Sequence, residues 1–180
     1  MAKIGDYDSL YSVLKQNSHV ATEAIFNHAI LLCLTAEQFP TADLICKLMV
    51  EKNFIPNEKS LARLIENNCR QKKVSRAFEL LQILRIHHRV VSPKTYTVIL
   101  TACIRQNLFT MADSLYKDIV DDNVPTDIQL SSTIVNMYCK TDRLKEAIAF
   151  HDDMVHRGMT PNDVTYTILI SACAKVGKID

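Results

Sequence analysis

Hydrophobic residues recur along this chain with a period of 35 residues. Within one period they fall into two blocks at helical spacing, each of which forms one apolar face. Residues 128–162 show this well, with Leu130, Ile134 and Tyr138 in the first block and Leu144 and Met154 in the second. The pattern predicts tandem pairs of helices. The recurring series are Ala42, Ala77, Ala112 and Ala147; Ile45, Leu80, Leu115 and Phe150; Met49, Leu84, Ile119 and Met154; and Ile4, Phe39, Val74, Phe109, Leu144 and Ile179.

The period divides the chain into predicted repeats. Full repeats occupy 23–57, 58–92, 93–127 and 128–162, residues 1–22 form the second half of an earlier repeat, and 163–180 form the first half of a later one. Each helix is too short to be stable alone, so neighbouring repeats must stack. We therefore predict an all-α fold: a single array forming a right-handed α-solenoid, or superhelix, of stacked antiparallel helix-turn-helix repeats. Because the chain starts and stops within a repeat, we expect a piece of a longer array.

The ends of the second helices have a recognisable residue type. Gly158 follows the basic residues His156 and Arg157, as is typical of a helix C-terminus. The equivalent residues in the other repeats are Asn53, His88 and Asn123. Gly and Asn tolerate the left-handed conformation, so three of these four residues favour a left-handed cap.

Composition supports helices and narrows the function. Three Gly and five Pro are too few for the many turns of a mostly-β chain. A net charge of +1 excludes a broadly basic coat, although it allows a local basic stripe. The longest apolar run near the N-terminus, Ala29–Leu34, is too short to span a membrane. Residues 1–22 lack the layout of a signal or transit peptide, so we expect no membrane association.

The sequence gives little evidence for catalytic or metal-binding residues. The six cysteines form no Cys-x-x-Cys pair, so we interpret them as reduced, small packing residues. His151 and His156 are five residues apart, unlike the i, i+4 histidines of a zinc protease. No Gly-rich phosphate loop or nucleophile elbow is present. We predict no enzyme activity, no metal, no cofactor and no small-molecule substrate.

Three segments carry a resemblance to a known family. They are VTYTILISACAKVGKID (Val164–Asp180), KTYTVILTACIRQN (Lys94–Asn107) and MYCKTDRLKEAIAFHDDMVHRGMTPN (Met137–Asn162). With their 35-residue period they resemble the P-type repeats of the pentatricopeptide repeat family. Tetratricopeptide repeats have a period of 34 residues and a Trp-containing pattern, and this chain has no Trp.

The resemblance implies a solenoid that binds single-stranded RNA with about one base per repeat. In the family, the fifth residue of the first helix and the last residue of the repeat together select the base. The corresponding pairs here are Asn27 with Asn57, Ala62 with Ser92, Thr97 with Asp127, and Ser132 with Asn162, while Thr167 begins another. The family's code implies a pyrimidine for Asn27/Asn57, G for Thr97/Asp127 and A for Ser132/Asn162. Ala62 has no side-chain donor or acceptor, so its repeat is expected to contribute little.

Two further rows of residues are expected to contact RNA. The second position of each repeat sandwiches bases in the family, and only Val164 is the usual branched aliphatic residue in this row: Ala24, Lys59, Lys94, Gln129 and Val164. A cation also recurs near the end of each first helix, at Arg70, Arg105, Lys140 and Lys175, and such a stripe can follow phosphates. The alternative is that these cations only stabilise helix C-termini.

The leading hypothesis is a sequence-selective single-stranded RNA-binding protein that acts in organellar RNA processing, stability, editing or translation. One alternative is a protein-interaction scaffold, because helical solenoids also present surfaces to peptides. Another is the RNA-docking region of a larger RNA-processing enzyme. The family implies a mitochondrion or chloroplast, but since no transit peptide is visible, the cytoplasm and nucleus stay open.

Overall fold

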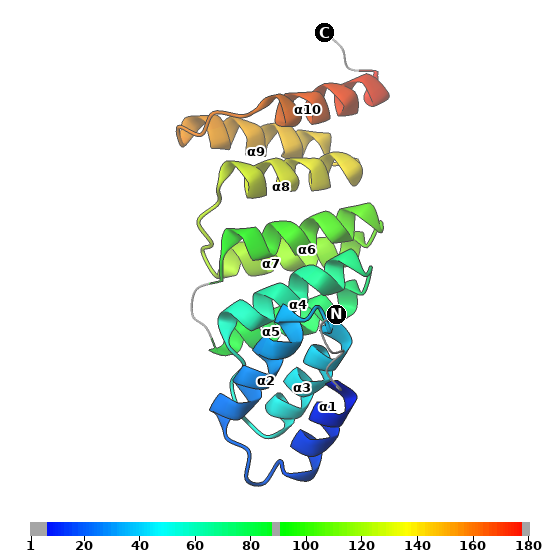
Figure 1. Cartoon of the computed structure of the whole chain (residues 1–180). Coiled ribbons are helices and arrows are strands. Elements are labelled where there is room, and N and C mark those ends of the chain that lie inside the picture. The colour runs from blue at the N-terminus through cyan, green and yellow to red at the C-terminus, as the bar shows by residue number, and fades with distance from the viewer. Residues whose placement is uncertain (1–6, 88–90, 178–180) are drawn as a thin grey trace. The chain divides into compact units, whose positions relative to one another are not determined.

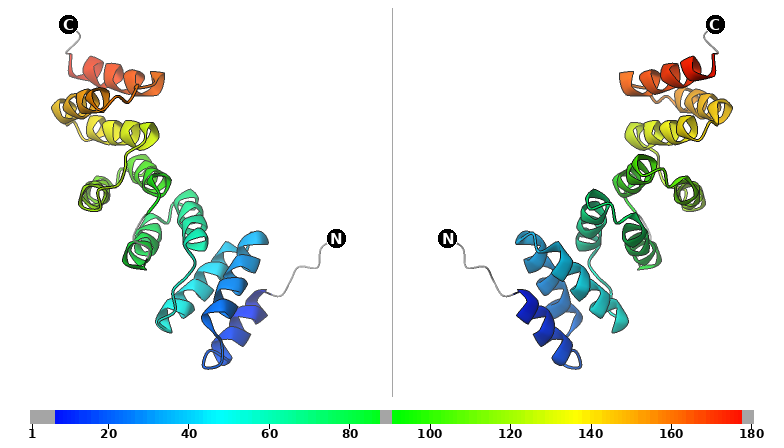
Figure 2. Two further views of the ribbon diagram at one scale, coloured as in Figure 1. Left: turned by 90° about the vertical axis from the view of Figure 1, so that its left-hand side faces the viewer. Right: turned by 90° about the vertical axis from the view of Figure 1, so that its right-hand side faces the viewer.

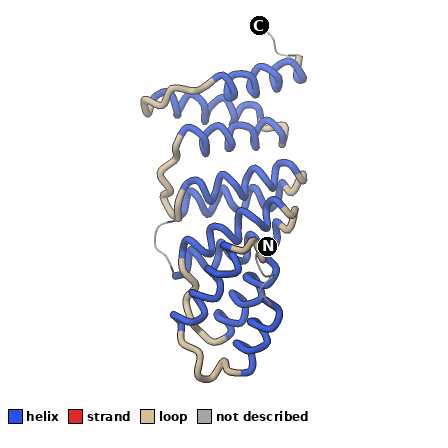
Figure 3. The backbone as a smooth tube through the Cα atoms, viewed as in Figure 1, coloured by secondary structure: helices blue, strands red, loops and turns tan. Residues whose placement is uncertain are grey.

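The computed structural model describes residues 7–87 and 91–177, which form ten α-helices and no strand (Figures 1 and 3). The predicted all-α architecture is confirmed. Three residues used in the sequence argument, Ile4, His88 and Ile179, lie outside the described residues. The helices are α1 (Tyr7–Gln16), α2 (Glu23–Thr35), α3 (Phe39–Glu51), α4 (Glu58–Arg70), α5 (Val74–His87), α6 (Pro93–Arg105), α7 (Phe109–Asp121), α8 (Ile128–Lys140), α9 (Leu144–His156) and α10 (Asp163–Val176).

The helices form two compact units, Met1–Arg89 and Val90–Asp180. In the first unit, α2 packs beside α4, α3 lies against both, α1 packs on α2 and α3, and α5 packs on α4. In the second unit, α6, α8 and α10 lie side by side as one layer (Figure 2). Helix α7 packs on α6 and α8, and α9 packs on α8 and α10, so α7 and α9 form a second layer. Each unit therefore repeats the same packing of helical pairs.

The start of each first helix is set by the residue before it. These helices begin 35 residues apart, at Glu23, Glu58, Pro93, Ile128 and Asp163. The side chains of Asn57, Asp127 and Asn162 each accept a hydrogen bond from a backbone N–H in the first turn of the following helix. Such caps satisfy donors that have no partner within the helix. The last residue of three predicted repeats is thus also the N-cap of the next helix.

The alanine row lies in the core of the second helices. Ala42, Ala77, Ala112 and Ala147 are all fully buried, one in each of α3, α5, α7 and α9. A methyl group at this position allows a close approach that a larger side chain would block by overpacking. Full burial in four successive pairs is consistent with a position where only a small side chain fits.

A left-handed residue follows eight of the ten helices in the described part of the chain. After the second helices these are Asn53, Asn123 and Gly158, which confirms the caps predicted from residue type. The first helices end in the same way, and there the residues are Glu37, Lys72, Asn107, Asp142 and Gly177. The chain then turns back through a hydrogen bond such as the one from the Leu108 N–H to the Cys103 carbonyl (2.9 Å). This six-to-one bond is the signature of a Schellman motif.

The cysteines pack within the helical layers. Cys33, Cys46 and Cys103 are buried, whereas Cys69, Cys139 and Cys173 are half-buried. Burial raises the pKa of the Cys46 thiol to about 12 and that of Cys103 to about 11, which disfavours the reactive thiolate. Across residues 7–87 and 91–177, no cluster of His, Cys, Asp and Glu could hold a metal ion. No helix in these ranges is long and apolar enough to cross a membrane.

Candidate nucleic-acid interface

A groove of about 470 Å³ in the second unit brings together four residues of the predicted site. Ser132 and Asn162 form a predicted base-selecting pair, and Gln129 and Val164 are predicted to sandwich the same base. All four line this one groove, which is formed mainly by α8 and α10. Its full lining is Thr101, Ile128, Gln129, Ser132, Thr133, Asn136, Asn162, Val164 and Ile168.

The predicted selecting pair in this groove is joined through a third side chain. The Ser132 hydroxyl lies 2.7 Å from the Thr165 hydroxyl, which in turn contacts Asn162 Oδ1 at 3.1 Å. Ser132 Oγ also lies 2.7 Å from the carbonyl oxygen of Ile128, one helical turn earlier. Thr165 is fully buried and Ser132 is 7% exposed, while Asn162 is exposed. Two residues that are 30 positions apart are thus mechanically linked.

Asn162 has a fixed orientation because it caps α10. Its Oδ1 accepts the backbone N–H of Thr165 at 3.1 Å, and an N–H group can only donate. The carbonyl end of the amide must therefore point toward the helix, which leaves the Nδ2 group to meet other partners. The capping bond thus decides which end of this amide is which.

Thr97 and Asp127, the preceding pair, present acceptors. Thr97 is 8% exposed, and its hydroxyl donates to the Pro93 carbonyl at 3.0 Å. Asp127 is exposed and accepts the Leu130 N–H through Oδ1 at 2.7 Å, which leaves Oδ2 for other partners. An ionised carboxylate can only accept hydrogen bonds. Unlike Ser132 and Asn162, the two side chains are not joined through a third residue in the described part of the chain.

Asn27 and Asn57 in the first unit are in direct contact. The Asn27 Oδ1 accepts the backbone N–H of Asn57 at 2.8 Å, and its Nδ2 donates to the Ile55 carbonyl at 3.4 Å. Asn57 Oδ1 accepts the N–H of Lys59 at 2.9 Å, which caps α4. Both amide carbonyls are therefore engaged with backbone. The Asn57 NH₂ group is the end that remains, and the Asn27 NH₂ group keeps one N–H besides the one that faces Ile55.

The other predicted base-selecting residues are less organised. Ala62 is half-buried, Ser92 is exposed, and they belong to different units. The Ser92 side chain makes no capping bond to α6. Thr167 is exposed and donates to the Asp163 carbonyl at 2.7 Å.

The sandwich row and most of the cation row are open to solvent. All five sandwich residues are exposed: Ala24, Lys59, Lys94, Gln129 and Val164. Arg105, Lys140 and Lys175 are exposed near the C-terminal ends of α6, α8 and α10. Lys140 follows Ser132 by eight residues, which is about 12 Å along a helix. Arg70 differs, because its guanidinium pairs with Glu66 at 2.7 Å.

Thr165 joins the predicted pair, and sequence reasoning missed it. It is the third residue of its repeat, a position that carries no weight in the family's pairing of fifth and last residues. A signal was present, because a hydroxyl residue three positions after an Asn cap can satisfy the cap and also reach the neighbouring helix.

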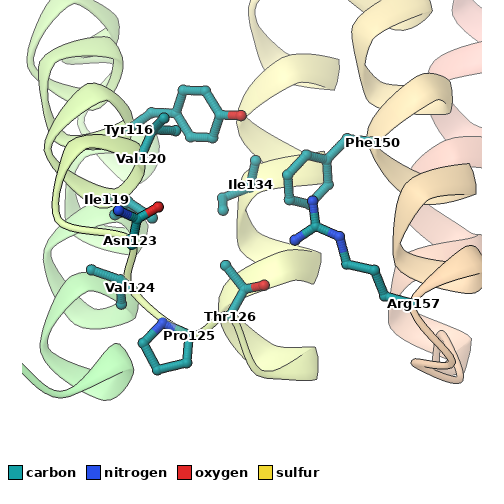
Figure 4. A pocket seen from close by; sticks show the side chains of 10 residues that line it. All are labelled: Tyr116, Ile119, Val120, Asn123, Val124, Pro125, Thr126, Ile134, Phe150 and Arg157. Atoms are coloured by element: carbon teal, nitrogen blue, oxygen red, sulfur yellow. The ribbon is translucent and has the colours of Figure 1, made fainter.

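A second cavity, of about 350 Å³, lies away from the predicted site residues. It is bordered by α7, α8, α9 and the turn after α7, and Figure 4 shows Tyr116, Phe150 and Arg157 among the side chains around it. The rings of Tyr116 and Phe150 lie 6.5 Å apart, and both pack near Tyr138. None of the predicted RNA-contacting residues lines this cavity.

Comparison with known families matches the repeats directly. A model of the PPR repeat family matches residues 131–175, and a PPR repeat model matches residues 94–124. A pentatricopeptide repeat-containing protein of Arabidopsis thaliana is 27% identical over 171 residues, covering 91% of this chain. The chain belongs to the pentatricopeptide repeat family. It spans 35% of the length of that relative and 19% of the length of a second, chloroplastic one.

Other relatives in the family work in different settings. A mitochondrial pentatricopeptide repeat-containing protein of A. thaliana is 24% identical over 86% of this chain and 37% of its own length. Small ribosomal subunit protein mL103 of the same plant is 22% identical, over 86% of this chain and 38% of its own length. The named compartments of these relatives are thus the chloroplast and the mitochondrion.

Solved structures share the fold. The crystal structure of PPR10 in complex with an 18-nt psaJ RNA element matches with a TM-score of 0.62 and 21% identity, over 95% of this chain and 26% of that one. The PPR domain of A. thaliana protein-only RNase P 1, in complex with tRNA, matches with a TM-score of 0.64 and 12% identity, over 86% and 82% of the two chains. At these identities the likeness establishes the helical-repeat fold.

Proposed function

We propose that this pentatricopeptide repeat chain binds single-stranded RNA and selects bases with individual repeats, as part of RNA processing, stability, editing or translation in a mitochondrion or chloroplast. The observation that carries the proposal is the groove between α8 and α10. It surrounds one space with a polar pair, Ser132 and Asn162, and with two side chains suited to cover base faces, Gln129 and Val164. Unstacked bases are bound in this way, by edge hydrogen bonds and face contacts.

A nucleotide fits this arrangement in one general orientation. Its base edge meets Ser132 and Asn162 near the start of the first helices, while Gln129 and Val164 cover its faces. Exposed Lys140 and Lys175 lie at the opposite ends of α8 and α10, where they attract phosphates. Because α6, α8 and α10 lie side by side, successive repeats can accept successive nucleotides.

The repeats differ in the hydrogen bonds that they offer. Thr97 and Asp127 present acceptors, which suit the N1–H and amino donors of guanine. Asn27 and Asn57 present amide donors, which suit the carbonyl and ring-nitrogen acceptors of a pyrimidine. Ser132 and Asn162 are assigned to adenine by the family's code, and Ala62 leaves its repeat without a selecting side chain.

The chain itself is proposed to be a binder rather than an enzyme. Its relatives include ribosomal components, and the similar RNase P domain belongs to an RNA-processing protein, so a catalytic partner domain is one alternative. A protein-interaction scaffold is the other alternative. The cavity beside Tyr116, Phe150 and Arg157 is the specific feature that favours it, since aromatic and Arg side chains are common anchors in protein interfaces.

Selection from a random single-stranded RNA pool tests the proposal. The expected result is enrichment of a short motif with adjacent G and A, selected by Thr97/Asp127 and Ser132/Asn162. The double variant Thr97→Asn with Ser132→Asn should change the enriched bases without unfolding the helices. The matched control is Thr110→Asn with Ser114→Asn, which alters two exposed positions of α7 and should leave the motif unchanged. No enrichment, combined with capture of a protein that is insensitive to salt, would refute RNA selection.

A further inference from the structure

The polar contacts around Thr165 outnumber the hydroxyl protons that could form hydrogen bonds in them. Three short contacts link Ile128 O, Ser132 Oγ, Thr165 Oγ1 and Asn162 Oδ1 in a row. The two atoms at the ends of this row are carbonyl oxygens, which only accept. Only the two hydroxyl protons are available to fill the three contacts, so at most two of them are hydrogen bonds at any moment.

The two hydroxyl oxygens lie only 2.7 Å apart, so one of them must donate to the other. Two arrangements of the protons meet this condition. In one, Ser132 donates to Thr165 and Thr165 donates to Asn162. In the other, Thr165 donates to Ser132 and Ser132 donates to Ile128. Both arrangements direct both hydroxyl protons toward protein acceptors. In neither does Ser132 have a proton left to donate to a base.

Asn162 is restricted by the same row. Its Oδ1 always accepts the Thr165 N–H, and in the first arrangement it also accepts the Thr165 hydroxyl. The carbonyl end of the amide is therefore held inward, and its NH₂ group is the end that meets the groove. The pair offers one acceptor, on Ser132, and one set of donors, on Asn162.

We propose that Thr165 is a specificity-determining positioning residue, which holds Ser132 as an acceptor and Asn162 as a donor toward a bound base. This rests on the proposed function, because it assumes that a base enters the groove. The favoured base is one whose edge places a donor at Ser132 and an acceptor at Asn162. Without the Thr165 hydroxyl, Ser132 keeps only the Ile128 carbonyl as a protein acceptor and can exchange that bond for one to a base, so bases with the opposite pattern are less disfavoured.

The row of contacts from Ile128 through Ser132 and Thr165 to Asn162, called the relay below, is specific to this repeat. The residues equivalent to Thr165 are Ile25, Ser60, Thr95 and Leu130. Thr95 is buried like Thr165, but the preceding repeat has Ala62 where Ser132 stands, and Ala62 has no hydroxyl. Thr95→Val is therefore a matched control, because it makes the same change at the same repeat position with no relay to break.

The experiment compares binding of four RNAs that differ only at the nucleotide served by the 128–162 repeat. Thr165→Val keeps the size of the side chain and the capping N–H but removes the hydroxyl. We expect the preference for the favoured base over the other three to fall about fivefold, the worth of one net hydrogen bond. Thr165→Ser should retain the preference, and Thr95→Val should leave it as in the parent chain.

Two outcomes overturn the proposal, and they differ from failure of the proposed function. An unchanged preference in Thr165→Val, with a melting temperature close to that of Thr95→Val, removes the role of Thr165. A preference that falls equally in Thr165→Ser shows that packing, not the hydroxyl, matters. If the parent chain binds no RNA, the proposed function fails together with any role in base choice. A slowly exchanging Thr165 hydroxyl resonance in the RNA-free protein then still reports whether the relay exists.

Discussion

The cation row gives the sharpest quantitative test of RNA binding. The perturbation is replacement of Arg105 and Lys140 by alanine in one chain. Both are exposed, at the C-terminal ends of the neighbouring helices α6 and α8. Neither is in an ion pair in the described residues, so both are available to phosphates.

The expected magnitude follows from counterion release. Each phosphate contact on a single strand contributes about 0.7 to the slope of log affinity against log salt concentration, so losing two contacts lowers the slope by about 1.4. Between about 50 mM and about 200 mM salt, the parent chain should then lose about sevenfold more affinity than the variant. Binding to all RNA sequences should weaken alike, because phosphates carry no base information.

The assay is fluorescence anisotropy with a labelled single strand at four or more salt concentrations. The matched control is Lys117→Ala with Lys145→Ala, which removes two exposed cations from the second layer, α7 and α9. This control should leave the slope as it is. If Arg105 and Lys140 can be removed without changing the slope, they serve only to stabilise helix C-termini, and the phosphate role is wrong.

Three other substitutions and one labelling experiment test the structure. Lys72→Gly should stabilise the first unit by about 1 kcal/mol in urea denaturation, because Lys72 has a φ of 60° that favours glycine; no gain would contradict the left-handed turn. Asp43→Ala should cost about 2 kcal/mol, since its two carboxylate oxygens accept from Arg76 Nε at 3.0 and 3.1 Å at a largely buried site. Asp153→Ala, which removes the exposed pair with Arg157, should cost less than about 1 kcal/mol; equal costs would refute the distinction. At pH 8 a thiol reagent should modify Cys103 about 100-fold more slowly than an ordinary thiol, because burial raises its pKa to about 11 and the thiolate fraction falls accordingly; fast labelling in the folded chain would contradict this.

The helices were predictable because residues that recur every 35 positions mark their buried faces and their starts. Ala42 and its equivalents mark the buried face of the second helices, and Asn57, Asp127 and Asn162 mark where first helices start. Both rows reflect local chemistry that recurs in each repeat. The assignment of bases to pairs stays a prediction, as does the division into repeats, although each first helix begins at the first residue of a predicted repeat.

Other features were not predictable because they depend on neighbours rather than on residue type. Glu37 and Lys72 adopt positive φ although neither residue favours it, since the packing of the next helix requires the chain to reverse there. The proposed role of Thr165 depends on Ser132, which lies across from it on α8. The period also runs without interruption through Arg89, so it does not mark the division into two units.

Helix capping explains how one backbone can present different hydrogen bonds to different bases. In each of Asn57, Asp127 and Asn162, one side-chain oxygen is consumed by an N–H of the following helix. What remains for a base is then an NH₂ donor in asparagine and a second acceptor oxygen in aspartate. An exchange between these two residues reverses the hydrogen-bonding character of the site while leaving the cap, and hence the start of the helix, intact. The last residue of the repeat can therefore change its specificity without destabilising the fold. One side-chain oxygen caps the helix, and the remaining NH₂ group or second oxygen is the part proposed to contact the base.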